Sequence, residues 1–334
     1  MLNGDSLHNR GFEGQSMLIA VLDGGFDKAD SISSLQHIWN DGRLLTVKDF
    51  VKDGRSIYNS NAHGTVVFSI IGGILSPYLH GSATQAEYAL IRTEEDSARY
   101  YENIIEEYNW VSGAEFADSL GADIISSSLG YSYFDDPSQN HSYEDMDGKT
   151  TPISVGASIA ASKGILVVTS AGNSAGPPWF KITAPADADS ILAIGAVDSA
   201  EVITSFSSRG PSFDGRVKPD ICAMGYANIS QAPNGYLVYC SGTSCSAPVI
   251  SGLAACLWQA HPQATNLQVE EAIKQSSHKY QDPDSVYGYG LPNFHLADII
   301  LSVLTNDSQQ ELAAFRLFPN PVIEQFYLEI IRKT

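Results

Sequence analysis

The chain has 334 residues, of which 43% are hydrophobic, and it carries 38 acidic against 19 basic side chains. The net charge of −19 argues against nucleic acid or an anionic membrane surface as a partner, because both repel a strongly acidic protein. The sequence has no apolar run of about 18 residues, so it predicts no membrane span. The length is sufficient for one large core, and a second full domain is not expected.

Short apolar runs alternate with helical patterns along the chain. The predicted strands are Met17–Leu22, Glu87–Ile91, Asp123–Ser128, Ile165–Thr169 and Ile191–Val197. The predicted helices are Thr65–Ile71, Ile104–Leu120, Ile153–Ala161, Ala247–Ala260 and Val269–Gln275. Continuous apolar strands are typical of a parallel sheet that is buried on both faces. The alternation therefore predicts a three-layer α/β fold, in which a doubly wound, mostly parallel sheet has helices on both faces.

Polar residues follow two of the predicted strands. Asp23 ends the first strand, and Asn173 comes shortly after Ile165–Thr169. In open α/β sheets the functional site lies outside the carboxyl ends of the strands. Asp23 and Asn173 are therefore expected at that edge of the sheet, and His63 opens the helix that follows the first strand.

Ser244 lies at the N-terminus of the helix that contains the apolar stretch Val249–Trp258. Unpaired amides at a helix N-terminus favour developing negative charge, so a serine at this place is a candidate nucleophile. A histidine is suited to take the serine proton, and an aspartate is suited to orient that histidine. Asn173 is suited to donate its side-chain amide to an oxyanion, with the Ser244 N–H as second donor.

Each of these residues also has a simpler interpretation when it is taken singly. Asp23 fits a turn at a strand end, His63 fits a helix cap and Asn173 fits a left-handed turn. Only their occurrence together in one chain, with a serine at a helix N-terminus, favours catalysis.

Four segments resemble the motifs of subtilisin-like serine peptidases, the subtilases. They are Ala20–Gly25, Asn61–Thr65, Ser170–Asn173 and Gly242–Pro248. The chain order aspartate, histidine, serine is that of the family, and the resemblance covers roughly residues 15 to 300. It implies a catalytic triad of Asp23, His63 and Ser244, with Asn173 in the oxyanion hole. The chain departs from the usual family pattern at Val66–Ser69 and at Cys245–Ser246, and neither departure removes a group that the mechanism uses.

The resemblance also implies where a peptide substrate binds. In the family, the strand edge that corresponds to Ser126–Gly130 pairs with the extended substrate backbone. The candidate substrate-binding residues are Ser128, Leu129, Gly130, Ser170, Ala171 and Gly172. Three acids at Glu94–Asp96 fall near a more remote subsite and hint at tolerance for basic substrate residues. Hydrated acids on a loop are the simpler interpretation of that triplet.

The polar segment Tyr131–Thr151 reads as a loop insertion near the cleft. Its acidic residues are Asp135, Asp136, Glu144, Asp145 and Asp147. Close carboxylates suit a structural calcium ion, although the spacing is not that of an EF-hand. A solvated rim loop is the alternative interpretation. No ligand set follows from the sequence, and the chemistry itself requires no cofactor.

The cysteines lie in the last third of the chain, at Cys222, Cys240, Cys245 and Cys256. Their spacing does not match a zinc site. Cys245 follows the candidate nucleophile and is expected to be a small buried side chain that points away from it. A disulfide between Cys222 and Cys240 would need export to an oxidising compartment, and free buried thiols are the expectation.

The two ends of the chain bear on its processing. Met1–Asp5 is polar and shows no signal peptide. Subtilases are typically made with a signal and an inhibitory propeptide, so we expect a processed or truncated start. Ala314–Val322 follows the polar linker Asn306–Glu311 and resembles the opening of the C-terminal sorting domain of type IX secreted bacterial proteins. The expected organisation is a peptidase domain over 1–304, then a linker and an ill-ordered remnant of a sorting domain over 305–334.

The resulting hypothesis is a secreted or cell-surface bacterial endopeptidase that acts as a monomer on proteins or peptides, through an acyl-enzyme on Ser244. One alternative is capture of the acyl-enzyme by an amine, which would ligate or cyclise peptides. Another is a catalytically silent fold used in binding or adhesion, or a fragment that does not mature without its propeptide. The intact set of catalytic residue types favours the enzyme.

Overall fold

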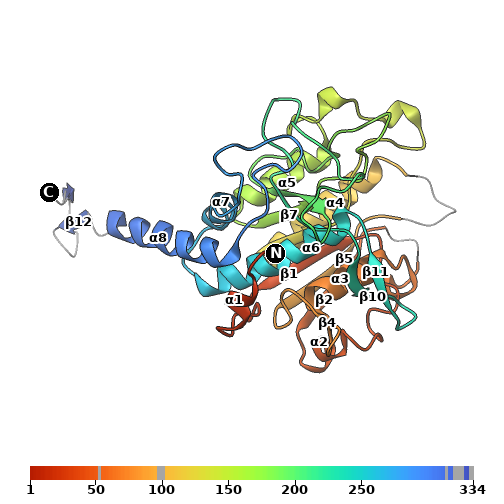
Figure 1. Ribbon diagram of the computed structural model, residues 1–334, viewed down its shortest axis with the longest axis horizontal. Helices are drawn as coiled ribbons and strands as arrows, with labels where there is room; N and C mark the ends of the chain where they lie inside the picture. Colours follow the sequence, from red (N-terminus) through yellow and green to blue (C-terminus); the bar gives the residue numbers. More distant parts are fainter. Residues whose placement is uncertain (52–53, 96–101, 313–314, 319–326, 331–334) are drawn as a thin grey trace.

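The computed structural model describes residues 1–51, 54–95, 102–312, 315–318 and 327–330 (Figure 1). A seven-stranded sheet forms its centre, in the strand order β2-β5-β1-β6-β7-β8-β9, and every neighbouring pair is parallel. The strands are β1 (Leu18–Asp23), β2 (Leu44–Asp49), β5 (Glu87–Arg92), β6 (Ile124–Ser127), β7 (Leu166–Ser170), β8 (Leu192–Val197) and β9 (Ile221–Met224). The predicted parallel sheet is confirmed.

Helices cover the two faces of this sheet, and three antiparallel strand pairs lie outside it. The helices are α1 (Asp5–His8), α2 (Gln36–Asn40), α3 (His63–Gly72), α4 (Ile105–Leu120), α5 (Pro152–Ser162), α6 (Thr243–Ala260), α7 (Asn266–Gln275) and α8 (Phe294–Leu312). The antiparallel pairs are β3 (Ile74–Leu75) with β4 (Leu79–His80), β10 (Asn228–Gln231) with β11 (Leu237–Cys240), and β12 (Phe315–Phe318) with β13 (Tyr327–Ile330).

Alternating side chains of the central strand β1 enter two separate cores. Ile19 and Val21 belong to the core that α3 and α6 cover. Leu18, Ala20 and Leu22 belong to the core that α4 and α5 cover. Because successive residues of a strand point to opposite faces, both faces must be apolar, and all six residues of β1 are buried. The predicted three layers are confirmed.

Two strands at the edges of the sheet were not predicted. In β2 the residues alternate between half-buried and exposed, so its sequence lacks the continuous apolar run of a central strand. The other edge strand, β9, has only four residues. A strand that is short or covered on one face carries a weaker apolar signal than a central strand, and this is why both were missed.

The C-terminal helix α8 corrects the expected linker. It continues to Leu312 through Asn306–Glu311, so the stretch interpreted as a polar linker is helical. Figure 1 shows the end of α8 extending away from the sheet. The resemblance of Ala314–Val322 to a sorting domain falls mostly outside the described residues. Within the part of the chain that the structure describes, no helix is both long and apolar enough to cross a membrane.

The strand order predicts a crevice at the carboxyl end of the central strand β1. Strand β1 pairs with β5 on one side and with β6 on the other. The chain therefore leaves the central strand in one direction along the sheet and later returns to its other side. The carboxyl ends of the three strands therefore meet at one edge of the sheet, where loops that leave in opposite directions open a crevice.

Helix α6 makes a tight contact at Gly252 with the turn between β4 and β5. A Cβ atom added to Gly252 would lie 2.7 Å from the Cβ of Ser82 and 2.9 Å from its carbonyl carbon. The hydroxyl of Ser82 also donates to the carbonyl of Pro248, at 3.1 Å. Glycine at position 252 therefore allows α6 to pack directly on this turn.

We expect Gly252→Ala to lower the free energy of unfolding by about 1–3 kcal/mol, because the added methyl group overpacks this contact. Urea unfolding followed by circular dichroism measures the change. Gly176→Ala is the matched control, since nothing lies within 4 Å of a Cβ at Gly176, and it should change stability by less than about 0.5 kcal/mol. Equal effects of the two substitutions would contradict the packing argument.

Candidate active site

Asp23 and His63 form a hydrogen-bonded pair at the carboxyl end of β1. The Nδ1 atom of His63 lies 2.9 Å and 3.0 Å from the two carboxylate oxygens of Asp23. The side chain of Asp23 is fully buried, whereas that of His63 is 37% exposed. A carboxylate at Nδ1 holds the proton on that nitrogen, so Nε2 is the basic atom of the ring.

Local backbone features bring the histidine to this position. The side chain of Asn61 accepts a hydrogen bond from the backbone N–H of His63, at 2.6 Å, at the start of α3. A Cβ atom at Gly64 would lie 2.9 Å from the Cβ of Asp23 and 2.9 Å from the ring of Phe26. Glycine at position 64 therefore allows α3 to approach the end of β1 closely enough for the Asp23–His63 bond.

Ser244 lies in the first turn of α6 and forms a reciprocal pair with Ser128. Its hydroxyl donates to the backbone carbonyl of Ser128 at 3.1 Å, and the Ser128 hydroxyl donates to the Ser244 carbonyl at 3.0 Å. Pro248 explains the second bond. It stands four residues after Ser244 and has no N–H, so the Ser244 carbonyl lacks its helical donor.

A second network fixes the side-chain amide of Asn173. Its Oδ1 atom accepts from the N–H and from the hydroxyl of Thr243, at 2.8 Å and 2.9 Å. The Thr243 hydroxyl in turn accepts from the N–H of Gly172, at 3.2 Å. Because both bonds go to Oδ1, the orientation of the amide is set and Nδ2 is the donor directed away from Thr243.

These residues line one cleft of about 360 Å³, which His63, Asn173 and Ser244 share. Five of the candidate substrate-binding residues also line it, namely Ser128, Leu129, Gly130, Ser170 and Gly172. Ala171 does not line the cleft, which corrects the sequence-based assignment. The Ala171 side chain is fully buried against Ile182, Ala186 and Ala193. Successive side chains of an extended segment point to opposite faces, so Ala171 points inward where Ser170 points to the cleft.

Sequence patterns did not indicate the remaining residues of the cleft wall. They are Glu102, Ser132, Ser174 and Thr183. Glu94, which belongs to the acidic triplet noted in the sequence, also lines the cleft. A Cβ atom added to Gly172 would lie 2.8 Å from the hydroxyl oxygen of Thr183. Glycine at position 172 therefore allows Thr183 to lie this close to the backbone. These residues come from separate loops, and no spacing in the sequence connects them.

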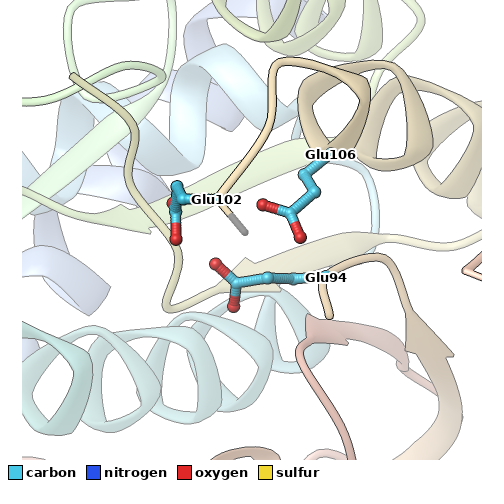
Figure 2. A group of neighbouring side chains, drawn as sticks. All are labelled: Glu94, Glu102 and Glu106. Atoms are coloured by element: carbon cyan, nitrogen blue, oxygen red, sulfur yellow. The ribbon is translucent and has the colours of Figure 1, made fainter. Parts of the chain in front are cut away.

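Glu94 and Glu95, the described members of the acidic triplet at positions 94–96, have different surroundings in the structure. Glu95 is ion-paired with the guanidinium groups of Arg55 and Arg92, whereas Glu94 faces the cleft, and position 96 lies outside the described residues. Figure 2 shows Glu94 beside Glu102 and Glu106. Burial raises the pKa of Glu106 to about 7, and the negative charges of Glu102 and Glu95 add to the rise.

Three carboxylates of the loop at 131–151 accept hydrogen bonds within its own turns, whereas Asp135 accepts from the N–H of Glu102. Asp136 accepts from the Ser138 N–H, Asp145 from the Ser142 N–H and Asp147 from the N–H groups of residues 149 and 150. In residues 1–51, 54–95 and 102–305, the group of carboxylates close enough to share an ion is Glu94, Glu102 and Glu106. Calcium in the 131–151 loop stays a prediction.

The cysteines pair differently from the expectation. Cys240 at the end of β11 forms a disulfide with Cys245, and their Cα atoms are 6.1 Å apart. Cys222 and Cys256 are free and buried, as expected, and burial raises the pKa of both thiols. The expected free thiol at Cys245 is wrong because the β10–β11 hairpin returns the chain beside the first turn of α6.

Comparisons with known proteins agree with this geometry. The chain matches the subtilase family, peptidase S8, over residues 14–290. Serine protease AprX of Bacillus subtilis (strain 168) is 30% identical over 318 residues, which cover 87% of this chain and 67% of AprX. Subtilisin of Bacillus pumilus is 28% identical, over 89% of this chain and 96% of that protein.

Solved structures share the fold. The prenylagaramide maturation protease PagA superimposes with a TM-score of 0.70 at 22% identity, over 90% of this chain and 99% of that chain. The self-cleaved protease domain of PatA gives a TM-score of 0.67 at 24% identity, over 87% of this chain and 98% of that chain. At this level of identity the likeness concerns the fold alone.

The disulfide encloses Ser244 in a short covalent loop, so its loss should loosen the turn that carries the hydroxyl. We expect Cys240→Ser to lower the free energy of unfolding by about 2 kcal/mol and to slow covalent labelling of Ser244 by a fluorophosphonate. A thiol reductant should slow labelling of the unmodified chain in the same way. Reductant added to the Cys240→Ser variant is the control, and a further slowing there would show that the disulfide is not responsible.

Proposed function

The chain belongs to the subtilase family and is a serine-type endopeptidase, and on this premise we propose that it hydrolyses peptide bonds through an acyl-enzyme on Ser244. The observation that carries the proposal is the buried Asp23–His63 hydrogen bond on the same cleft as the Ser244 hydroxyl. In this proposal His63 is the general base, Asp23 orients it and Ser244 is the nucleophile.

The first chemical step is attack on the scissile carbonyl carbon by the Ser244 oxygen. The hydroxyl leaves the Ser128 carbonyl by rotation about the Cα–Cβ bond and donates to Nε2 of His63, which takes the proton. The proton then passes from His63 to the leaving amine as the C–N bond breaks. Water deprotonated by His63 attacks the acyl-enzyme in the second half, and Ser244 regains its proton. Asp23 stabilises the imidazolium in both halves.

Asn173 and the first turn of α6 stabilise the oxyanion in this proposal. The amide of Asn173 is held by Thr243, which directs Nδ2 away from that bond, and the Ser244 N–H belongs to a helix N-terminus. Two preorganised donors in fixed positions need no reorganisation when negative charge develops on the carbonyl oxygen.

Proteins or peptides in extended conformation are the proposed substrates. Support comes from the two segments that flank the cleft, Ser128–Gly130 and Ser170–Gly172, which follow neighbouring parallel strands. An extended backbone that pairs with such an edge gains main-chain hydrogen bonds that do not depend on the substrate side chains.

Export to the bacterial cell surface or medium is part of the same proposal. The Cys240–Cys245 disulfide supports it, because disulfides persist in oxidising compartments. The net charge of −19 is compatible with a protein that stays soluble outside the cell. A propeptide partner and a monomeric enzyme remain predictions from the resemblance.

Labelling with a fluorophosphonate tests the activated serine. We expect a single adduct, located on Ser244 by mass spectrometry, that is absent in Ser244→Ala and lost in His63→Ala. Circular dichroism of each variant checks that it is folded. A folded chain that takes no adduct would contradict the proposed enzyme and favour a silent binding fold, whereas ligated product in peptide assays would favour transfer to an amine.

Asn173→Ala tests the oxyanion donor. Loss of one such donor in a peptidase of this family costs about a hundred- to thousandfold in kcat, and we expect a loss of the same order here with little change in KM. Steady-state hydrolysis of a chromogenic peptide measures both constants. Unchanged kcat would mean that Nδ2 of Asn173 does not reach the oxyanion.

A further inference from the structure

Three carboxylates outside the catalytic set converge beside the cleft. They belong to Glu94, Glu102 and Glu106, and one ligand oxygen from each lies within 4.8 Å of the others. Figure 2 shows the three groups directed toward a common centre. We propose that they form a binding site for a hard divalent cation, of which calcium is the best fit. The site goes beyond the proposed peptidase activity and does not depend on it.

The spacing suits a single ion. Calcium binds carboxylate oxygens at about 2.3–2.6 Å, so two of its ligands are separated by at most about 5 Å. A separation of 4.8 Å or less therefore lets one ion contact all three side chains. Glu94 follows β5, Glu102 precedes α4 and Glu106 lies in the first turn of α4. The ion would link the end of the sheet to the start of this helix.

Glu106 provides an observation that is independent of the clustering. Its side chain is 3% exposed. Its Oε1 atom accepts from the backbone N–H of Glu95 at 3.0 Å, which fixes the orientation of the carboxylate. Its Oε2 atom is buried without a hydrogen-bond partner among the described residues, and the carboxylate is directed at Glu94 and Glu102. Buried polar oxygens are almost always partnered, so this one indicates a ligand.

Charge favours a divalent ion over a cationic substrate side chain. A divalent ion offsets two of the carboxylate charges that gather at this site, whereas a lysine or arginine offsets one. The nearby guanidinium groups of Arg55 and Arg92 are ion-paired with Glu95. A basic side chain of a substrate would also have to extend past the cleft wall to reach the buried Glu106.

The donor set selects among divalent ions. All three ligands are carboxylates, which favours calcium, magnesium or manganese over the softer ions that prefer nitrogen or sulfur. Glu94 and Glu102 line the cleft, so water can complete the coordination from that side. Calcium accepts six to eight ligands in flexible geometry, whereas magnesium requires a near-ideal octahedron, so calcium places the weaker demand on three side chains that come from a loop and a helix.

Calcium titration of the full chain, carried out on Ser244→Ala to prevent self-cleavage, tests the proposal. After chelator treatment, isothermal calorimetry should find a site whose affinity falls at least about tenfold in Glu106→Gln, because one charged ligand is lost. Glutamine keeps the acceptor for the Glu95 N–H and so retains the local fold. Glu115→Gln is the matched control, since this acid is exposed on the same helix, and it should leave the affinity within about twofold.

Glu102→Gln, at a half-buried position, is the second variant if Glu106→Gln does not fold, and it should weaken binding by a similar factor. Calcium binding that neither variant affects would place the ion elsewhere, for example in the 131–151 loop, and would overturn the proposal. Absence of calcium binding would overturn it as well. If calcium does not bind and the active Glu102→Gln enzyme selectively loses kcat/KM for peptides with lysine or arginine, the carboxylates bind the substrate instead. Labelling of Ser244 in Glu106→Gln and Glu102→Gln chains that retain Ser244 separates this result from a failure of the catalytic proposal.

Discussion

The position of the first turn of α6 against the carboxyl edge of the sheet determines the geometry of the cleft. Pro248 removes the helical donor of the Ser244 carbonyl, and Ser128 at the end of β6 supplies the missing hydrogen bond. One turn of helix is thereby joined to the sheet at Ser244, the proposed nucleophile. The neighbouring Thr243 joins the same turn to the end of β7 and orients the amide of Asn173. The proposed nucleophile and the proposed oxyanion donor therefore share one rigid support.

His63 reaches this support from α3, which packs on the same face of the sheet as α6. The two neighbours of β1 in the sheet, β5 and β6, lead into the acidic wall and into the substrate edge respectively. Close approach of α3, which glycine at position 64 allows, brings His63 to the buried Asp23 at the end of the strand between them. The catalytic groups and the carboxylates of Glu94 and Glu102 consequently face one cleft, although they come from different crossover connections.

Much of the fold followed from apolar periodicity. The strands buried on both faces and the helices that cover them were predicted within a few residues, because continuous apolar runs and amphipathic repeats record burial directly. The edge strand β2 was missed because exposure of one face weakens its apolar signal. Asn306–Glu311 was interpreted as a linker because it is polar, yet it continues α8, since a helix that is anchored at its apolar start can extend through polar residues.

The sequence by itself determined the types and the chain order of the proposed catalytic residues, because each lies near the end of a strand or at the start of a helix, and those boundaries are encoded locally. The tertiary structure alone decided the pairing of Cys240 with Cys245, the inward direction of Ala171 and the convergence of Glu94, Glu102 and Glu106. These features depend on distances between loops and hairpins that chain folding brings together. Periodicity describes which face of an element is buried, and it carries no information about which residues of two separate loops will meet.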